Sequence, residues 1–229
     1  MRMWQQIRAS SLDRHIHSKA YAALVVSGSY EEAGDNGRFQ VHAGDVVFHD
    51  PFEAHLDRFF AGGAVVLNLV LPPSNHFFSI VARMTDPDAV VRMAEKSAAA
   101  AAELLCSSAQ TRPVKYADWP DELAATLIRS PILKLSEWGE KRGLAPWSVS
   151  RGFAQVFSIS PEAFRARARA RRALTSIRQT NLPLATIAAE LGFADQAHMT
   201  RSIRQLTGAA PRAWRSRAKG FKTEGYGPD

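Results

Sequence analysis

The sequence has few cysteines and no long apolar runs. Cys106 is the one cysteine among 229 residues, so intramolecular disulfides are excluded and a reducing compartment is expected. No stretch approaches the roughly 18 apolar residues of a membrane span, and residues 1–17 lack the apolar core of a secretory signal. These absences predict a soluble, cytoplasmic protein without a membrane partner, in which Cys106 is a structural thiol.

Several signatures of catalysis are also missing. The sequence has no Gly-x-Ser-x-Gly elbow, no glycine-rich phosphate-binding loop and no Cys-x-x-Cys pair. It therefore gives little support to an enzyme, and it predicts no required cofactor.

Charge is distributed unevenly along the chain. Residues 131–229 contain 17 Lys and Arg against 7 Asp and Glu, whereas residues 1–130 contain 12 against 15. A strongly basic half indicates a polyanionic partner, of which double-stranded DNA is the commonest, although a solubilising surface also explains the charge alone. The length favours two domains.

Residues 21–71 are typical of closely spaced antiparallel strands. Short apolar runs rich in β-branched residues alternate there with Gly, Asn and Asp, which predicts a small β-barrel or sandwich. Residues 86–108 follow as one predicted helix, with Asp86 as its N-cap and Pro87 in its first turn.

One face of this predicted helix carries mainly small residues. They recur at intervals of three and four, which lets a neighbouring element approach closely. That element is either the barrel or the same helix of a second copy, so a homodimer is one of the partner predictions. The residues of this face are Val90, Ala94, Ser97, Ala101 and Leu104.

The basic half contains an internal repeat at a spacing of 49 or 50 residues. Each copy is a helix, a glycine turn, a second helix and a helix that begins with proline, which is the composition of a helix-turn-helix. The second helix of such a unit lies in the major groove of DNA. The matched pairs are Gly143 with Gly192, Phe153 with Ile203, Pro161 with Pro211, and Phe164 with Trp214.

The second helices of the two copies are predicted at residues 146–157 and directly after Asp195, whose side chain is an expected N-cap. Helical spacing turns their apolar residues inward and their polar residues outward. The expected inward residues are Val149, Phe153, Val156, Met199 and Ile203. The predicted DNA-binding residues are Trp147, Ser148, Ser150, Arg151, Gln155, Gln196, Ala197, His198, Thr200, Arg201 and Arg204. Trp147 is alternatively a half-buried boundary residue, and His198 alternatively packs against the turn.

Five arginines lie on the helix predicted between the two copies. They are either solvated or in contact with phosphates, and the neighbouring motifs favour phosphate contact. A rigid helix here would hold the two reading helices about 34 Å apart, one turn of DNA. The arginines are Arg165, Arg167, Arg169, Arg171 and Arg172.

Residues 133–215 resemble the DNA-binding domain of the AraC/XylS family of transcription regulators, and the run "GFADQAH" from Gly192 is the most specific part of the resemblance. The chain departs from the family pattern at Gly139, Gly152 and Ile203. The two helix-interior glycines suggest a softer first unit. By the resemblance, base-facing or backbone-facing positions are Trp147, Ser150, Arg151, Gln196, Ala197, His198 and Arg201.

The stretches "HIHSKAYAALVVSG" and "GDVVFHDPFEAH" resemble the cupin-type sensor barrel of the same family. The resemblance places His15, His17 and His55 at the barrel mouth, and Tyr21 where metal-binding cupins usually carry glutamate. These four residues are the predicted ligand pocket. The histidines line that pocket, bind a divalent metal ion or are structural, and the sequence leaves the three interpretations open. Neither His42 nor His49 has a spacing that compels a role.

The sequence thus predicts an α+β protein, a cupin-like β-barrel followed by two helix-turn-helix units joined by a long helix. Its expected parts are a sensor domain at 1–80, a helical linker at 81–118, a DNA-binding domain at 119–220 and a tail at 221–229. The predicted function is a sequence-specific, nucleoid-associated transcription regulator controlled by a small-molecule effector, with RNA polymerase as a further partner. The alternative is a metal-dependent cupin enzyme with a basic localising domain. Activation and repression are not distinguished.

Overall fold

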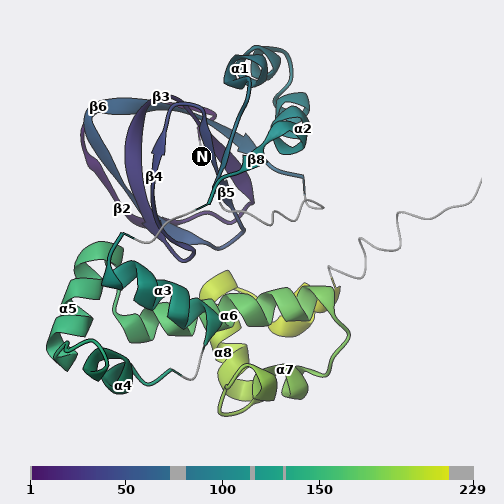
Figure 1. Ribbon diagram of the computed structural model, residues 1–229. Coiled ribbons are helices and arrows are strands. Elements are labelled where there is room, and N and C mark those ends of the chain that lie inside the picture. The colour runs from purple at the N-terminus through teal and green to yellow at the C-terminus, as the bar shows by residue number, and fades with distance from the viewer. Residues whose placement is uncertain (1, 73–80, 114–116, 131–132, 217–229) are drawn as a thin grey trace, which may run out of the picture. The chain divides into compact units, whose positions relative to one another are not determined.

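A computed structural model describes residues 2–72, 81–113, 117–130 and 133–216 (Figure 1). Internal contacts divide the chain into unit 1, residues 1–122 with 156–158, and unit 2, residues 123–155 with 159–229. Unit 1 holds an antiparallel sheet and unit 2 is helical, which confirms the predicted α+β class. Among the described residues, no helix combines the length and the apolar character that crossing a membrane requires.

The described residues of unit 1 form one eight-stranded sheet whose paired strands are all antiparallel. Its strands are β1 (Trp4–Ile7), β2 (Ser11–Ile16), β3 (Tyr21–Gly34), β4 (Gly37–His42), β5 (Asp45–His49), β6 (Ala54–Val70), β7 (Val81–Arg83) and β8 (Gln110–Thr111).

Strands β3 and β6 form the backbone of this sheet, because they pair from Tyr21 opposite Val70 to Gly34 opposite His55. Their register shifts on both sides of Gly28, which has φ +78°, and a Cβ there would collide with the carbonyl oxygen of Gly63. Glycine is therefore required at this bend. On one side of it the two strands pair with β5 and β1, and on the other side with β4 and β2, so the sheet rolls into a barrel-like form.

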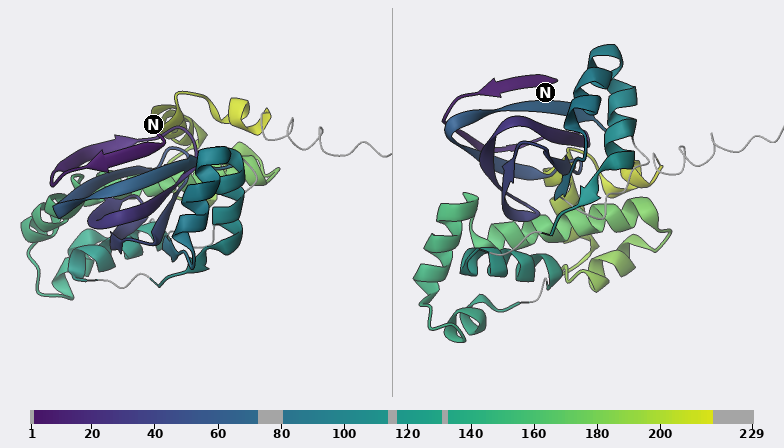
Figure 2. Two further views of the ribbon diagram at one scale, coloured as in Figure 1. Left: turned by 90° about the horizontal axis from the view of Figure 1, so that it is seen from above. Right: turned by 45° about the horizontal axis from the view of Figure 1, so that its top comes forward.

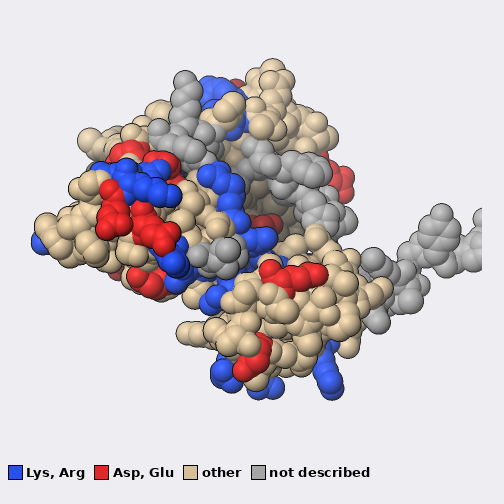
Figure 3. All heavy atoms as spheres, turned by 60° about the horizontal axis from the view of Figure 1, so that its bottom comes forward, with Lys and Arg blue, Asp and Glu red and all other residues tan. Residues whose placement is uncertain are grey.

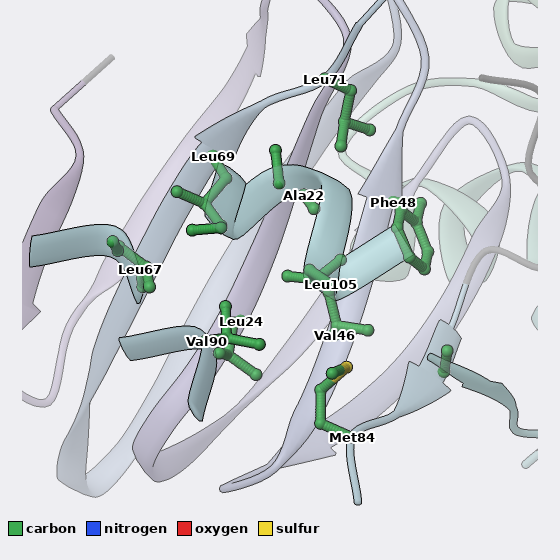
Figure 4. Close-up of a cluster of buried hydrophobic side chains, with 14 residues drawn as sticks. Ala22, Leu24, Val46, Phe48, Leu67, Leu69, Leu71, Met84, Val90 and Leu105 are labelled. Atoms are coloured by element: carbon green, nitrogen blue, oxygen red, sulfur yellow. The ribbon is translucent and has the colours of Figure 1, made fainter. Parts of the chain in front are cut away.

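The two faces of the rolled sheet bury different residues. Side chains alternate along a strand, so Ala22 and Leu24 of β3 belong to an outer cluster while Tyr21, Ala23 and Val25 belong to an inner one. The outer cluster is covered by the helices that follow β7, and Figure 4 shows their side chains among those of the strands. The inner cluster leads toward the barrel cavity described below.

The segment expected as one helix is two helices, α1 (Pro87–Lys96) and α2 (Ala98–Ser108). The predicted cap at Asp86 is confirmed, since its side chain accepts from the Ala89 amide at 2.9 Å. The expectation of continuity was wrong because Ser97 is extended, with φ −157°, and its hydroxyl caps α2 by accepting from the Ala100 amide at 3.2 Å. Ser97, which was predicted to lie on the face of small residues within one helix, is therefore the boundary between two helices.

Helices α1 and α2 lie side by side in both views of Figure 2 and pack on the sheet. Val90, Ala101 and Leu105 have no exposed surface and contact the outer cluster. Of the two predicted alternatives, the face of small residues therefore packs on the barrel. Residues 81–111 also supply β7 and β8, which extend the sheet beyond β5.

Unit 2 has a core formed by the repeated helices. The rings of Phe153 and Phe164 meet edge to face at 5.2 Å, and Ile177, Ile187 and Met199 are buried with them. The other labelled helices among the described residues are α3 (Trp119–Arg129), α4 (Leu135–Glu140), α5 (Pro146–Phe157), α6 (Pro161–Gln179), α7 (Leu184–Glu190) and α8 (Gln196–Thr207). Residues 211–216 are also helical.

Candidate DNA-reading helices and barrel cavity

Two turns of the same geometry connect α4 to α5 and α7 to α8. Gly143 has φ +65° and Gly192 has φ +71°, a conformation that glycine adopts without strain. After each glycine, a backbone amide bonds back to the preceding helix at 2.9 Å: Leu144 to the Gly139 carbonyl and Phe193 to the Ala188 carbonyl. These equivalent bonds, 49 residues apart, make the sequence repeat a structural repeat.

Helix α5 turns polar residues and one large aromatic residue to the solvent. The Trp147 side chain is 69% exposed, whereas Val149 and Phe153 are buried. Val156, expected inward, is half-buried, and Phe157 is buried at the next position. Of the predicted DNA-binding residues on α5, the exposed ones are Trp147, Ser150, Arg151 and Gln155, and the half-buried one is Ser148.

Helix α8 begins at a strong cap. The Asp195 carboxylate accepts from the His198 amide at 2.6 Å, as predicted, and Met199 and Ile203 are buried. The His198 ring stands edge-on against Phe193 at 5.3 Å, so part of this side chain packs on the turn. Of the predicted DNA-binding residues on α8, the exposed ones are Gln196, Ala197, Arg201 and Arg204, and the half-buried ones are His198 and Thr200.

Arg165 and Arg169 of α6 bind carbonyl groups inside unit 2. Arg165 donates to the Leu133 carbonyl at 2.8 Å. Arg169 donates to the Gly192 carbonyl at 3.0 Å and lies 4.8 Å from the centre of the Phe193 ring. These contacts give both side chains a structural role, where the sequence favoured phosphate contact. On the face drawn in Figure 3, Lys and Arg form several separate patches with Asp and Glu between them.

A small cavity of about 60 Å³ lies inside the rolled sheet. The four residues predicted for the barrel pocket all line it. His15 stands opposite His55 in the β2–β6 pairing, with their rings 4.4 Å apart, and the Tyr21 hydroxyl hydrogen bonds with His55 Nε2 at 3.2 Å. The His17 ring lies 4.9 Å from those of both His15 and Tyr21.

Sequence reasoning missed a second group of buried polar residues, of which Glu32, His49 and Asp57 line this cavity and Glu53 lies close to Glu32 and His49. The signal for them is the period of two along each strand, because Glu32 follows the inward Tyr30 by two residues. His49 likewise follows Val47, and Asp57 follows His55. His49 stacks on the Tyr21 ring at 4.3 Å.

Burial controls the ionisation of these groups. It lowers the pKa of His17 to about 4, with help from neighbouring His15, and it lowers the pKa of His55 below its ordinary range. Burial also raises the pKa of Asp57 to about 7 and that of Glu32 above its ordinary value. The imidazoles of His17 and His55 are therefore held in the neutral form, which is the form that binds metal ions, and the charged forms of the Glu32 and Asp57 carboxylates are disfavoured.

The three histidines predicted as metal ligands lie close together. One ring nitrogen from each of His15, His17 and His55 lies within 4.8 Å of the others. The Nδ1 atom of His15 bonds with the Asp13 carbonyl at 2.8 Å, which leaves Nε2 as the coordinating atom. Tyr21 occupies the position where metal-binding cupins usually carry a glutamate ligand, and its hydroxyl hydrogen bonds with His55.

Comparison with known proteins concerns mainly unit 2. Residues 138–217 match the family profile described as a helix-turn-helix domain. No curated protein matches the chain.

Solved structures with some likeness include the C-terminal domain of AraT, a response regulator from Geobacillus stearothermophilus. It has 21% identity and a TM-score of 0.40 over 43% of this chain and 84% of that one. A regulator with an AraC-type DNA-binding domain from Chromobacterium violaceum has 20% identity and a TM-score of 0.40, over 42% and 88%. ToxT from Vibrio cholerae has 11% identity and a TM-score of 0.44, over 95% and 99%. The domain assignment rests on the profile match.

Proposed function

We propose that this chain, a DNA-binding transcription regulator whose residues 138–217 form an AraC-type helix-turn-helix domain, reads DNA with α5 and α8. The observation that carries the proposal is the repeated turn at Gly143 and Gly192, because each turn is followed by a helix with a polar, exposed face. In a helix-turn-helix this face meets base edges in the major groove.

Specific roles follow from the chemistry of the exposed side chains. Arg151 on α5 and Arg201 on α8 each present a guanidinium that can bond to O6 and N7 of guanine. Gln196 begins α8 and has the donor and acceptor pair that recognises adenine. Trp147, which is largely exposed, offers apolar contact to the sugar-phosphate edge or to a thymine methyl group. Ser150 and Arg204 hold phosphates.

Helix α6 links the two reading helices within unit 2. Its 19 residues correspond to about 28 Å at 1.5 Å per residue, which approaches the ~34 Å repeat of two successive major-groove segments. A single chain can therefore recognise a site that is not a palindrome. Pairing of two copies and contact with RNA polymerase are further partner proposals, tested by the mass of the DNA-bound complex and by transcription from a template carrying the site.

Unit 1 is proposed to be a sensor that controls this DNA binding, and the chain to regulate rather than catalyse. An effector that binds one state of the barrel more tightly shifts the population of DNA-competent molecules. The cavity of about 60 Å³ suits an ion or a molecule of a few atoms, since drug-sized ligands occupy roughly 300–1,000 Å³. ToxT has been solved with an unsaturated fatty acid; a ligand of that size would require the present cavity to open.

The test is selection of genomic DNA fragments by the full chain, followed by footprinting of the preferred site. Arg201→Ala should weaken discrimination at one base position by about 1–3 kcal/mol, and Arg151→Ala should do so at another position. Arg178→Ala, which removes an exposed arginine at the end of α6, is the matched control and should leave base preference unchanged. Absence of any preferred site, or equal preference in the Arg201→Ala variant, would contradict the proposal.

A further inference from the structure

One buried polar group of unit 1 is a set of two carboxylates and two imidazoles. Glu32 on β3, His49 on β5, Glu53 before β6 and His55 on β6 each offer one donor atom, and these four atoms lie within 4.8 Å of one another. All four residues are between 1% and 3% exposed. His49, Glu53 and His55 are close in sequence, and the pairing of β3 with β5 and β6 brings Glu32 to them.

The separations in this set are too long for good hydrogen bonds. His49 Nε2 lies 3.6 Å from Glu32 Oε2, and His49 Nδ1 lies 3.5 Å from Glu53 Oε1. Nitrogen to oxygen hydrogen bonds are typically about 2.7–3.2 Å long. Donors placed about 2.1 Å from one tetrahedral ion are instead separated by about 3.4 Å. These two separations are therefore close to the distance between neighbouring ligands of one ion.

Unpartnered atoms point to the same conclusion. Within the described part of the chain, Glu32 Oε1, His49 Nδ1 and His55 Nδ1 are buried without a hydrogen-bond partner. Glu32 forms an ion pair with His49, and both residues are buried away from water. An uncompensated buried carboxylate is costly. A divalent cation would balance two carboxylates and use the free lone pairs at once.

We propose that Glu32, His49, Glu53 and His55 bind one divalent first-row transition-metal ion inside the barrel. Two imidazole nitrogens and two carboxylate oxygens are a donor set that suits Zn²⁺, Fe²⁺, Co²⁺ or Mn²⁺. The cavity of about 60 Å³ leaves room for one or two water molecules beside such an ion. Tyr21 bonds to His55 Nε2 at 3.2 Å and orients that ligand through its second nitrogen.

This set differs from the three histidines at the cavity mouth. It shares His55 with them but replaces the half-buried His15 and His17 by fully buried carboxylates and His49. His55 belongs to both sets, so variants of the residues that belong to one set alone distinguish the inner site from the mouth. The proposal concerns unit 1 alone and stands or falls independently of DNA recognition by α5 and α8.

The experiment is titration of the chelator-treated full chain with Co²⁺, followed by visible absorption, and then displacement by Zn²⁺. One equivalent should bind, and Glu32→Gln and Glu53→Gln should each weaken binding at least tenfold. His15→Gln and His17→Gln are the matched controls at the mouth and should change affinity less than threefold. Circular dichroism of every variant without metal checks its fold.

A second measurement on the unaltered protein needs no variant. X-ray absorption at the zinc edge should report two histidine ligands and two oxygen ligands from the protein, where the mouth site would give three histidines. Failure to bind one equivalent would overturn the proposal. So would unchanged affinity in both carboxylate variants, a loss in His17→Gln equal to that in Glu32→Gln, or a three-histidine spectrum.

Discussion

Replacing Gly139 in α4 by alanine tests how closely the first helix-turn-helix unit is packed. In an exposed helix this change stabilises by about 1 kcal/mol, because alanine has the higher helix propensity. Gly139 is buried, and a Cβ there would lie 3.0 Å from both the Leu144 carbonyl oxygen and Val149 Cγ2. Favourable contacts between carbon atoms lie at about 3.5–4.0 Å. Overpacking of this kind costs about 1–3 kcal/mol, so the net expectation is destabilisation by about 0–2 kcal/mol.

A double-mutant cycle with Val149→Ala isolates the close contact. The second substitution removes one of the two atoms that the new Cβ would meet. Gly139→Ala should therefore cost about 1 kcal/mol less in the Val149→Ala background than in the parent chain. Hydrogen exchange of the α4 and α5 amides under increasing urea, resolved by mass spectrometry, measures this free energy separately from that of unit 1.

Two outcomes would refute the reasoning. Stabilisation of the parent chain by about 1 kcal/mol would show that helix propensity outweighs the contact. Equal costs in both backgrounds would show that Val149 is not the obstacle. The expected result would instead make Gly139 a packing requirement, so that glycine in this helix does not by itself indicate a softer unit.

Two further substitutions test individual elements. Asp195→Ala removes the carboxylate that caps α8 at 2.6 Å from the His198 amide. It should destabilise unit 2 by about 0.5–2 kcal/mol in urea unfolding, whereas Asp195→Asn should retain most of the stability. Equal losses in the two variants would argue against capping. Leu105→Ala truncates a fully buried side chain of α2; it should destabilise unit 1 by about 2–5 kcal/mol, and a loss below 1 kcal/mol would contradict packing of α2 on the sheet.

The helix-turn-helix units could be predicted from the sequence because their determinants are local. A left-handed turn requires glycine at Gly143 and Gly192, and the cap at Asp195 lies beside the helix that it begins. One glycine turn between two helices is a weak indication of a helix-turn-helix, but its repetition 49 residues later makes the prediction strong. The break at Ser97 was missed although it is local too, because serine is tolerated within helices and alanines follow it on α2.

The inner polar set of the barrel depends on long-range pairing. Glu32 reaches the cavity because β3 and β6 stay paired beyond the two register shifts beside Gly28. His49 does so because it stands opposite Tyr21 in the pairing of β5 with β3. A shift by one residue would turn each side chain to the other face of the sheet. The sequence shows these residues and their alternation along each strand. It does not show which strands pair and in which register, and that long-range pairing brings the residues together.

The roles of the α6 arginines are separated by salt dependence. Arg169 bonds to the carbonyl of the turn residue Gly192 and lies over the Phe193 ring, so it ties the connecting helix to the turn that precedes α8. Arg169→Ala should destabilise unit 2 by about 2 kcal/mol, since hydrogen bonds to charged groups contribute about 1.5–3 kcal/mol. The slope of log affinity for DNA against log salt should stay unchanged, whereas loss of one phosphate contact would reduce its magnitude by about 0.9. Arg169→Lys, which keeps the charge but loses the planar fork, should also destabilise the unit. A reduced slope in Arg169→Ala at unchanged stability would assign this side chain to phosphate instead.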